Sequence, residues 1–136
     1  MPIYSVGILR QFTAMHFLVG GDWGRENQWH SHHYRVEAIF EGDSLDGHGY
    51  LIDIAAIGPR LDALVERYRD KTLNELPEMA GLNPGLETFA TILADRLADS
   101  LADGLADSLT ALTIKLWESE DAFATCRRSM LAPPER

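Results

Sequence analysis

Residues 29–41 alternate with a period of two, and this pattern constrains the fold more than any other feature of the chain. The positions with mainly apolar or imidazole side chains are His30, His32, Tyr34, Val36 and Ala38, and the positions between them are mostly polar. Successive side chains of a β-strand point to opposite faces of a sheet, so the pattern predicts a strand with one buried face. Such a strand needs partner strands and a covering layer.

The rest of the chain supplies both. Further strands are predicted at residues 3–14, with Gly7 as a bulge, at 111–117 and at 123–130, the last two forming a hairpin across 118–122. Asp53 can cap a helix that runs to about Tyr68, and a second helix is predicted from Gly85 or Leu86 to near Gly104. Residues 19–28 and 73–84 have loop composition. The order ββααββ predicts an α+β fold.

Composition limits the class of protein. With 136 residues, 46% hydrophobic and 24% charged, residues 1–136 are expected to fold as a single domain. The formal charge of −9 disfavours binding to nucleic acid or to an anionic membrane surface. The single cysteine, Cys126, forms no internal disulfide, and no apolar run resembles a membrane span or signal peptide. A cytoplasmic location is therefore expected.

Three histidines are candidate metal ligands. His30 and His32 lie on the same face of their strand, and His16 follows a strand that is expected to pair with it. Three imidazoles with an open fourth position are typical of catalytic Zn²⁺, and Glu26 is a candidate fourth donor for a storage or structural site. A His-X-His pair on a strand is also compatible with ordinary polar side chains. His33 and His48 are interpreted as structural or exposed residues.

Six separated segments carry a further signal. They are Phe-Thr-Ala-Met-His at 12–16, His-Ser-His-His-Tyr at 30–34, Gly-Tyr-Leu-Ile-Asp-Ile at 49–54, Leu-Asn at 73–74, Asn-Pro-Gly-Leu-Glu at 83–87 and Trp-Glu-Ser at 117–119. In this order they resemble the motifs of the 6-pyruvoyltetrahydropterin synthases and their bacterial relatives, the 6-carboxytetrahydropterin synthases. Each motif is short, but the ordered set covers nearly the whole chain.

The resemblance implies a fold, an assembly and an activity. The fold is the tunnelling fold, an antiparallel four-stranded sheet with two helices on one face, whose copies form barrels as trimers or hexamers with sites between subunits. The activity is that of a zinc-dependent lyase acting on the C6 side chain of a reduced pterin, 7,8-dihydroneopterin or its triphosphate. The resemblance also implies that Glu118 binds the pterin ring, because a carboxylate can accept two adjacent N–H groups.

The chain departs from the family pattern at the proton-transferring residues. Glu26 stands where the family has a cysteine, and the family's Asp-His pair is replaced by Arg69-Asp70-Lys71. Glu26 is therefore the candidate general base, with Asp70 or Lys71 as a second proton relay. Gly85 also replaces a threonine of the pterin pocket.

The reaction and the phosphorylation of the substrate remain open at this point. Relatives with a carboxylate in place of the cysteine cleave dihydroneopterin to a hydroxymethylpterin, so a retro-aldol cleavage stands beside the synthase reaction. The candidate cations for a triphosphate are Arg25, Lys71, Arg127 and Arg128. The alternatives are a non-catalytic pterin- or metal-binding homologue and a barrel-forming structural protein without a ligand.

Overall fold

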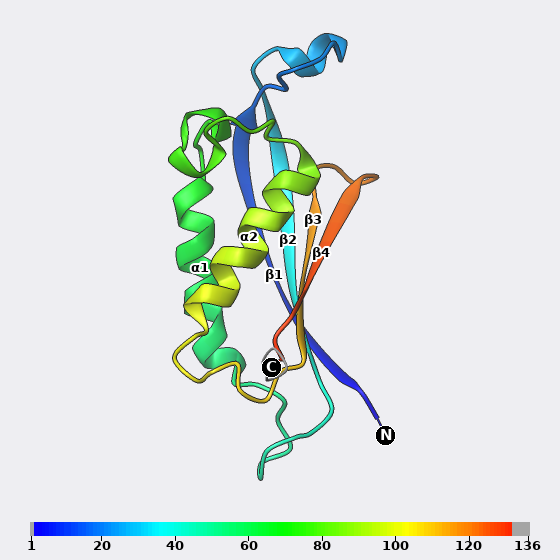
Figure 1. Cartoon of the computed structure of the whole chain (residues 1–136), viewed down its shortest axis with the longest axis vertical. Coiled ribbons are helices and arrows are strands. Elements are labelled where there is room, and N and C mark those ends of the chain that lie inside the picture. The colour runs from blue at the N-terminus through cyan, green and yellow to red at the C-terminus, as the bar shows by residue number, and fades with distance from the viewer. Residues whose placement is uncertain (1, 132–136) are drawn as a thin grey trace, which may run out of the picture.

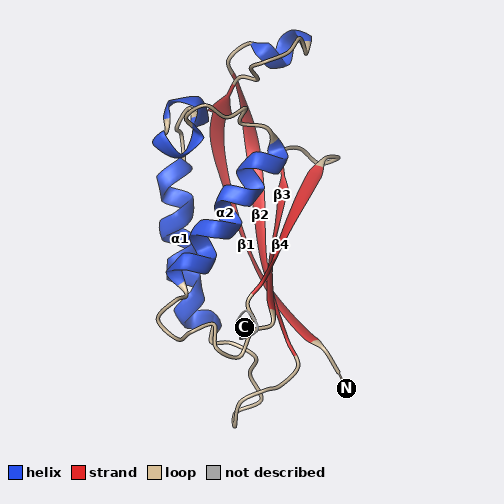
Figure 2. Cartoon of the chain, in the orientation of Figure 1, coloured by secondary structure: helices blue, strands red, loops and turns tan. Residues whose placement is uncertain are grey.

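The computed structural model describes residues 2–131 as one four-stranded sheet covered by two helices on a single face (Figures 1 and 2). In chain order the elements are β1 (Tyr4–His16), β2 (His30–Gly42), α1 (Ile54–Tyr68), α2 (Leu86–Ser100), β3 (Ala111–Trp117) and β4 (Phe123–Ser129). The strands lie in the order β1-β2-β3-β4, and each neighbouring pair is antiparallel. The predicted ββααββ order and α+β class are confirmed.

The pairing of β1 with β2 sets the position of the histidines. It runs without interruption from Tyr4 opposite Gly42 to His16 opposite His30. The bulge predicted at Gly7 is therefore wrong, because Gly7 pairs regularly with Ile39. The first strand also continues two residues beyond the predicted end, so that His16 belongs to the sheet itself. The alternation of β1 weakens near its end, which is why the sequence alone placed that end too early.

The core lies between the sheet and the helices. Alternate strand residues that face the helices are buried, and they include Phe12, Tyr34, Val36, Ile114 and Leu116. They meet Leu61 and Val65 of α1 and Phe89 and Leu93 of α2. As predicted, Asp53 caps α1, and its side chain accepts a hydrogen bond of 3.0 Å from the Ala55 N–H.

The second helix ends earlier than predicted, at Ser100 instead of near Gly104. Beyond it the chain turns, and both Leu101 and Leu109 are buried. A leucine every four residues drifts around an α-helix, so a helix that continued past Leu101 would carry Leu109 away from the core. Arg60 of α1 stabilises the exit by donating hydrogen bonds to the Ser100 carbonyl and the Asp103 carboxylate.

The two predicted loops contain short 3₁₀ helices, at Gly24–Asn27, Leu73–Glu75 and Pro77–Met79. Single turns of this kind leave little periodicity in a sequence, so they were not predicted. The loop between β1 and β2 projects past the end of the sheet (Figure 1). Among the helices of residues 2–131, none is both long enough and apolar enough to cross a membrane.

Candidate metal centre

Three imidazole rings meet where β1 ends and β2 begins. His16, the last residue of β1, pairs with His30, the first residue of β2, and Ala14 pairs with His32. All three rings lie on the helix-covered face because side chains alternate along each strand. Their centroids are 4.5, 4.9 and 4.8 Å apart for the pairs 16–30, 16–32 and 30–32, and the rings are steeply inclined to one another. The structure thus brings the three predicted ligands together.

Backbone carbonyls orient two of these rings. The Nδ1–H of His16 donates to the carbonyl of Pro84 at 2.7 Å, and the Nδ1–H of His30 donates to the carbonyl of Gln28 at 2.6 Å. With the proton on Nδ1, the Nε2 atom of each neutral ring carries a lone pair. Such carbonyl contacts commonly fix the tautomer and orientation of metal-binding histidines.

The Nε2 atoms meet the requirements of a cation site. His16 is buried, and its Nε2 has no hydrogen-bond partner within residues 2–131. The Nε2 atoms of His30 and His32 are 3.0 Å apart. A buried nitrogen without a partner is costly, and a cation among the three atoms removes that cost. The residues present therefore fit a metal ion.

Glu26 completes the cluster from the loop. It lies in the 3₁₀ helix Gly24–Asn27, and its Oε2 is 2.9 Å from Nε2 of His30 and 3.9 Å from Nε2 of His32. One donor atom from each histidine and from Glu26 can be chosen so that all four lie within 4.8 Å of one another. Three imidazole nitrogens with one carboxylate oxygen form a donor set that suits zinc.

Burial tunes the protonation of the site. It lowers the pKa of His16 and of His32 below the ordinary value, and the neighbouring imidazoles lower both further. These rings are therefore neutral at pH 7, which is the form that binds metals. Burial raises the pKa of Glu118, and the nearby carboxylates of Glu26 and Glu87 add to the effect.

An aromatic cluster forms the floor beneath the imidazoles. The Tyr34 ring is buried, with its centroid 5.7 Å from that of His32. On its other sides it packs against Phe12 at 5.5 Å and Phe89 at 5.2 Å. Burial raises the pKa of Tyr34, which keeps its hydroxyl neutral. This packing joins the candidate metal centre to the core and restricts the motion of its strands.

Glu118 lies at the other side of the histidine cluster. It follows β3, and its N–H donates to the carbonyl of Ala122, which closes the β3–β4 turn. Its Oε2 is 3.9 Å from Nε2 of His32, and its side chain is partly exposed. The predicted pterin-binding carboxylate is therefore next to the predicted metal ligands.

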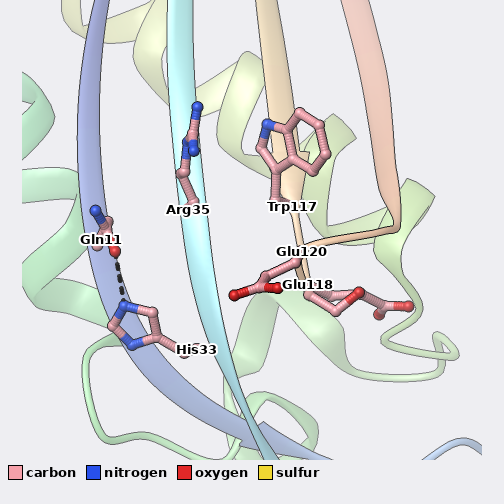
Figure 3. A pocket seen from close by; sticks show the side chains of 7 residues that line it. Gln11, His33, Arg35, Trp117, Glu118 and Glu120 are labelled. Atoms are coloured by element: carbon pink, nitrogen blue, oxygen red, sulfur yellow. Dashed lines mark hydrogen bonds between the residues drawn. The ribbon is translucent and has the colours of Figure 1, made fainter.

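A cavity of about 480 Å³ adjoins Glu118 (Figure 3). It is lined by Gln11, His33, Arg35, Trp117, Glu118, Ser119 and Glu120. His33 points away from the candidate metal ligands, as predicted, and its Nε2 donates to Gln11 Oε1 at 2.8 Å. The cavity opens on the helix-free face, whereas the three metal-site histidines lie on the other face. Glu118 thus lies next to both the cavity and the histidine cluster, a relation that the sequence did not reveal.

Asp70 and Lys71 lie outside the donor cluster. Their segment runs along the outer edge of β1, where the Asp70 N–H donates to the Thr13 carbonyl at 2.7 Å and the Met15 N–H donates to the Lys71 carbonyl at 2.9 Å. Both side chains are exposed. Within one chain the structure does not bring them to the histidines. Cys126 is half-buried on β4.

Comparisons with solved structures show that the fold is shared with pterin enzymes. The 6-pyruvoyl tetrahydropterin synthase of Caenorhabditis elegans is 20% identical, with a TM-score of 0.81 over 95% of this chain and 98% of that one. The Plasmodium falciparum enzyme is 14% identical, with a TM-score of 0.79 over 94% and 99%. A Plasmodium vivax 6-pyruvoyltetrahydropterin synthase, described as a catalytic-residue mutant with glutamate replaced by alanine, is 15% identical, with a TM-score of 0.77 over 96% and 100%.

The family follows from the sequence itself. The family model for 6-pyruvoyl tetrahydropterin synthase matches residues 6–129. The chain therefore belongs to the 6-pyruvoyl tetrahydropterin synthase family. A search among curated protein sequences found no match.

Proposed function

We propose that the chain is a zinc-dependent lyase acting on the C6 side chain of a reduced pterin, 7,8-dihydroneopterin or its triphosphate. Family membership supports the substrate class. The observation that carries the proposal is the meeting of the three imidazoles with Glu118, whose Oε2 lies 3.9 Å from Nε2 of His32. Glu118 therefore lies close enough to the candidate metal site for both to contact one bound substrate.

Each residue at the site has a distinct task in this proposal. His16, His30 and His32 hold Zn²⁺, which when bound polarises the side-chain oxygens of the pterin. Glu118 accepts hydrogen bonds from the ring N–H and the exocyclic amine. These two donors favour the carboxylate form of Glu118 and offset the effect of burial on its pKa.

Glu26 is the proposed general base. Its carboxylate is beside the imidazoles, within reach of a proton on a substrate bound there. The Plasmodium vivax protein, in which a glutamate is described as the catalytic residue, supports a carboxylate in this role. Asp70 or Lys71 is proposed as the second relay. Because they lie along the edge of β1, they would reach a site formed with a neighbouring copy.

Assembly is part of the proposal. In the single chain β1 and β4 are the edge strands, and an open sheet with two edges can close by pairing with further copies. We propose that residues 1–136 act as one domain and form trimers or hexamers with sites between subunits. A cytoplasmic place of action is proposed from the lone Cys126.

Product analysis tests the activity. Zinc-loaded protein is incubated with dihydroneopterin and, separately, with its triphosphate, and the products are followed by mass. Formation of 6-hydroxymethyl-dihydropterin indicates retro-aldol cleavage, in which any triphosphate leaves still attached to the two-carbon fragment. Release of free inorganic triphosphate indicates the synthase reaction. Tight pterin binding with no turnover of either compound would instead identify a non-catalytic binding homologue, the alternative suggested by the missing cysteine and Asp-His pair.

A matched pair of variants tests the binding role of Glu118. Glu118→Gln replaces one acceptor oxygen by a donor, so kcat/KM is expected to fall about 10- to 100-fold, the value of one or two charged hydrogen bonds. Asp121→Asn, in the same turn but not lining the cavity, is the control and should leave kcat/KM nearly unchanged. Equal losses in both variants would contradict the assignment of Glu118.

A further inference from the structure

The position of Glu26 requires an explanation, because its side chain is 50% exposed and lies on a loop. A long exposed carboxylate ordinarily samples several rotamers, which weakens any single contact. Here its Oε2 lies 2.9 Å from Nε2 of His30. The loop backbone must therefore be fixed if this carboxylate is to stay at the metal centre.

The side chain of the next residue, Asn27, fixes that backbone. Its Nδ2 donates to the carbonyls of Leu18 at 3.0 Å and Gly21 at 2.9 Å, and its Oδ1 accepts from the Trp23 N–H at 2.6 Å. Both amide hydrogens and the amide oxygen are used, all with backbone groups of the same loop. We name this set of three hydrogen bonds the Asn27 clamp.

Backbone contacts carry the effect of the clamp to Glu26. The Glu26 carbonyl accepts from the Leu18 N–H at 2.8 Å, and the Glu26 N–H donates to the Trp23 carbonyl at 3.3 Å. The Asn27 clamp holds both Leu18 and Trp23, because Asn27 donates to the Leu18 carbonyl and accepts from the Trp23 N–H. Glu26 is therefore tied on both sides to residues that Asn27 holds.

The distances at the carboxylate match those of a metal ligand. In a tetrahedral zinc site with bonds near 2.1 Å, neighbouring donor atoms are roughly 3.4 Å apart. The Oε2 of Glu26 lies 2.9 Å and 3.9 Å from Nε2 of His30 and His32, values that bracket this separation. The side chain of Glu26 is half exposed, whereas His16 is buried. The carboxylate therefore lies on the solvent side of the histidine cluster.

We infer that Asn27 is a positioning residue that holds the Glu26 carboxylate at the metal centre as a fourth donor in the substrate-free protein. The inference rests on the proposed function, because it requires the three histidines to bind zinc. It predicts that zinc affinity depends on Asn27. The three hydrogen bonds of the Asn27 clamp go to loop backbone groups and not to the histidines.

A double-mutant cycle on zinc affinity tests the inference. Affinity is measured by competition with a chromophoric chelator for the full chain, Asn27→Ala, Glu26→Gln and the double variant. Each single change is expected to weaken binding about 10- to 100-fold. The double variant should be within about twofold of Glu26→Gln, because Asn27 acts through Glu26. Losses that multiply in the double variant would overturn the inference.

Gln28→Ala is the matched control. It truncates a neighbouring exposed amide side chain for which residues 2–131 offer no recorded hydrogen bond, and it retains the carbonyl that orients His30. Its zinc affinity should stay within about twofold of the unchanged chain. If Asn27→Ala behaves like Gln28→Ala, the clamp has no effect on the metal and the inference fails.

Two further outcomes separate this inference from the proposed function. If the unchanged chain binds no zinc, the proposed function itself fails. If zinc binds with the same affinity to all variants, the histidine site stands and only the role of Asn27 and Glu26 is lost. Should Asn27→Ala fail to fold, the visible spectrum of the Co²⁺-loaded chain is compared with that of Glu26→Gln, and identical spectra would exclude Glu26 as a donor.

Discussion

At the scale of single residues, His16 has the surroundings expected of a metal ligand. Its ring is buried, its Nδ1–H is held by the Pro84 carbonyl, and its Nε2 has no partner among the described residues. In the metal-free protein, leaving this buried nitrogen without a hydrogen bond raises the free energy of the folded state, and a bound ion would remove that penalty. Stability is therefore reduced locally at the place where binding is needed.

The protonation of His16 and His32 leads to a pH prediction. In the folded, metal-free protein their pKa values lie below 6.5, whereas the unfolded chain has the ordinary value. Below about pH 6.5 the unfolded state binds more protons, so the free energy of unfolding falls as the pH drops from 7.5 to 5.5. Urea unfolding of chelator-treated protein at both pH values measures this fall.

Two variants check the origin of the pH dependence. His16→Asn is expected to reduce the difference in unfolding free energy between pH 7.5 and 5.5, because one buried imidazole is gone. His48→Asn, at an exposed position, should preserve it. A pH dependence that is unaffected by His16→Asn would show that other groups cause it.

The sequence predicted the clustering of the three histidines better than their surroundings. Alternation along one strand was sufficient to place His30 and His32 together, because residues two apart always share a face. The Pro84 carbonyl is 68 residues from His16, and the Asn27 clamp depends on an irregular loop. Neither has a periodic signal, so neither could be predicted. Asp70 and Lys71 were chosen by motif position, which says nothing about distance within one chain.

At the scale of elements, one carboxylate joins the two helices. Glu78, in the 3₁₀ helix Pro77–Met79, pairs with Arg67 of α1 and with Arg96 of α2, and it accepts a hydrogen bond of 2.8 Å from the Tyr68 hydroxyl. The Arg67 guanidinium above all lowers the pKa of Glu78 to about 2. The segment between the helices is thereby attached both to α1 and to α2.

Glu78→Gln is expected to lower the free energy of unfolding at pH 7 by about 1–3 kcal/mol, because buried Tyr68 and two arginines lose a charged partner. The stabilisation by Glu78 is present above its unfolded pKa near 4.5 and is lost as the pH falls toward 2. Urea unfolding at pH 7 and pH 3 should therefore show a smaller difference in the variant. Glu66→Gln, which removes an exposed ion pair with Arg69, is the control and should change little.

The helix ends show where periodicity stops being informative. The start of α1 was predicted from Asp53, because a cap is a local chemical signal. The end of α2 was not, because the leucine repeat continues through residues that leave the helix. Leu109 is nevertheless buried, because the chain turns beyond Ser100, and such a turn is a property of the tertiary structure.

At the scale of the whole molecule, the sheet has two edges. Within residues 2–131, the backbone hydrogen bonds on the outer edge of β1 involve Thr13 and Met15 alone, and β4 forms the other edge. Long unpaired edges tend to pair with another chain. In the proposed assembly, these edges are where copies of the chain would pair.

Sedimentation at neutral pH tests the proposed assembly. The chain has a mass of 15.2 kDa, and the expected particle contains three or six copies. Dilution that dissociates the particle should also abolish pterin turnover if the sites lie between subunits, whereas zinc binding by the histidines should persist. A monomer with full activity would contradict the assembly.

The tie between His16 and Pro84 gives the metal centre a long reach. It links the end of β1 to the segment directly before α2. On the proposed function, an ion held by His16 would therefore also restrain the chain that leads into the helical layer, through a single carbonyl.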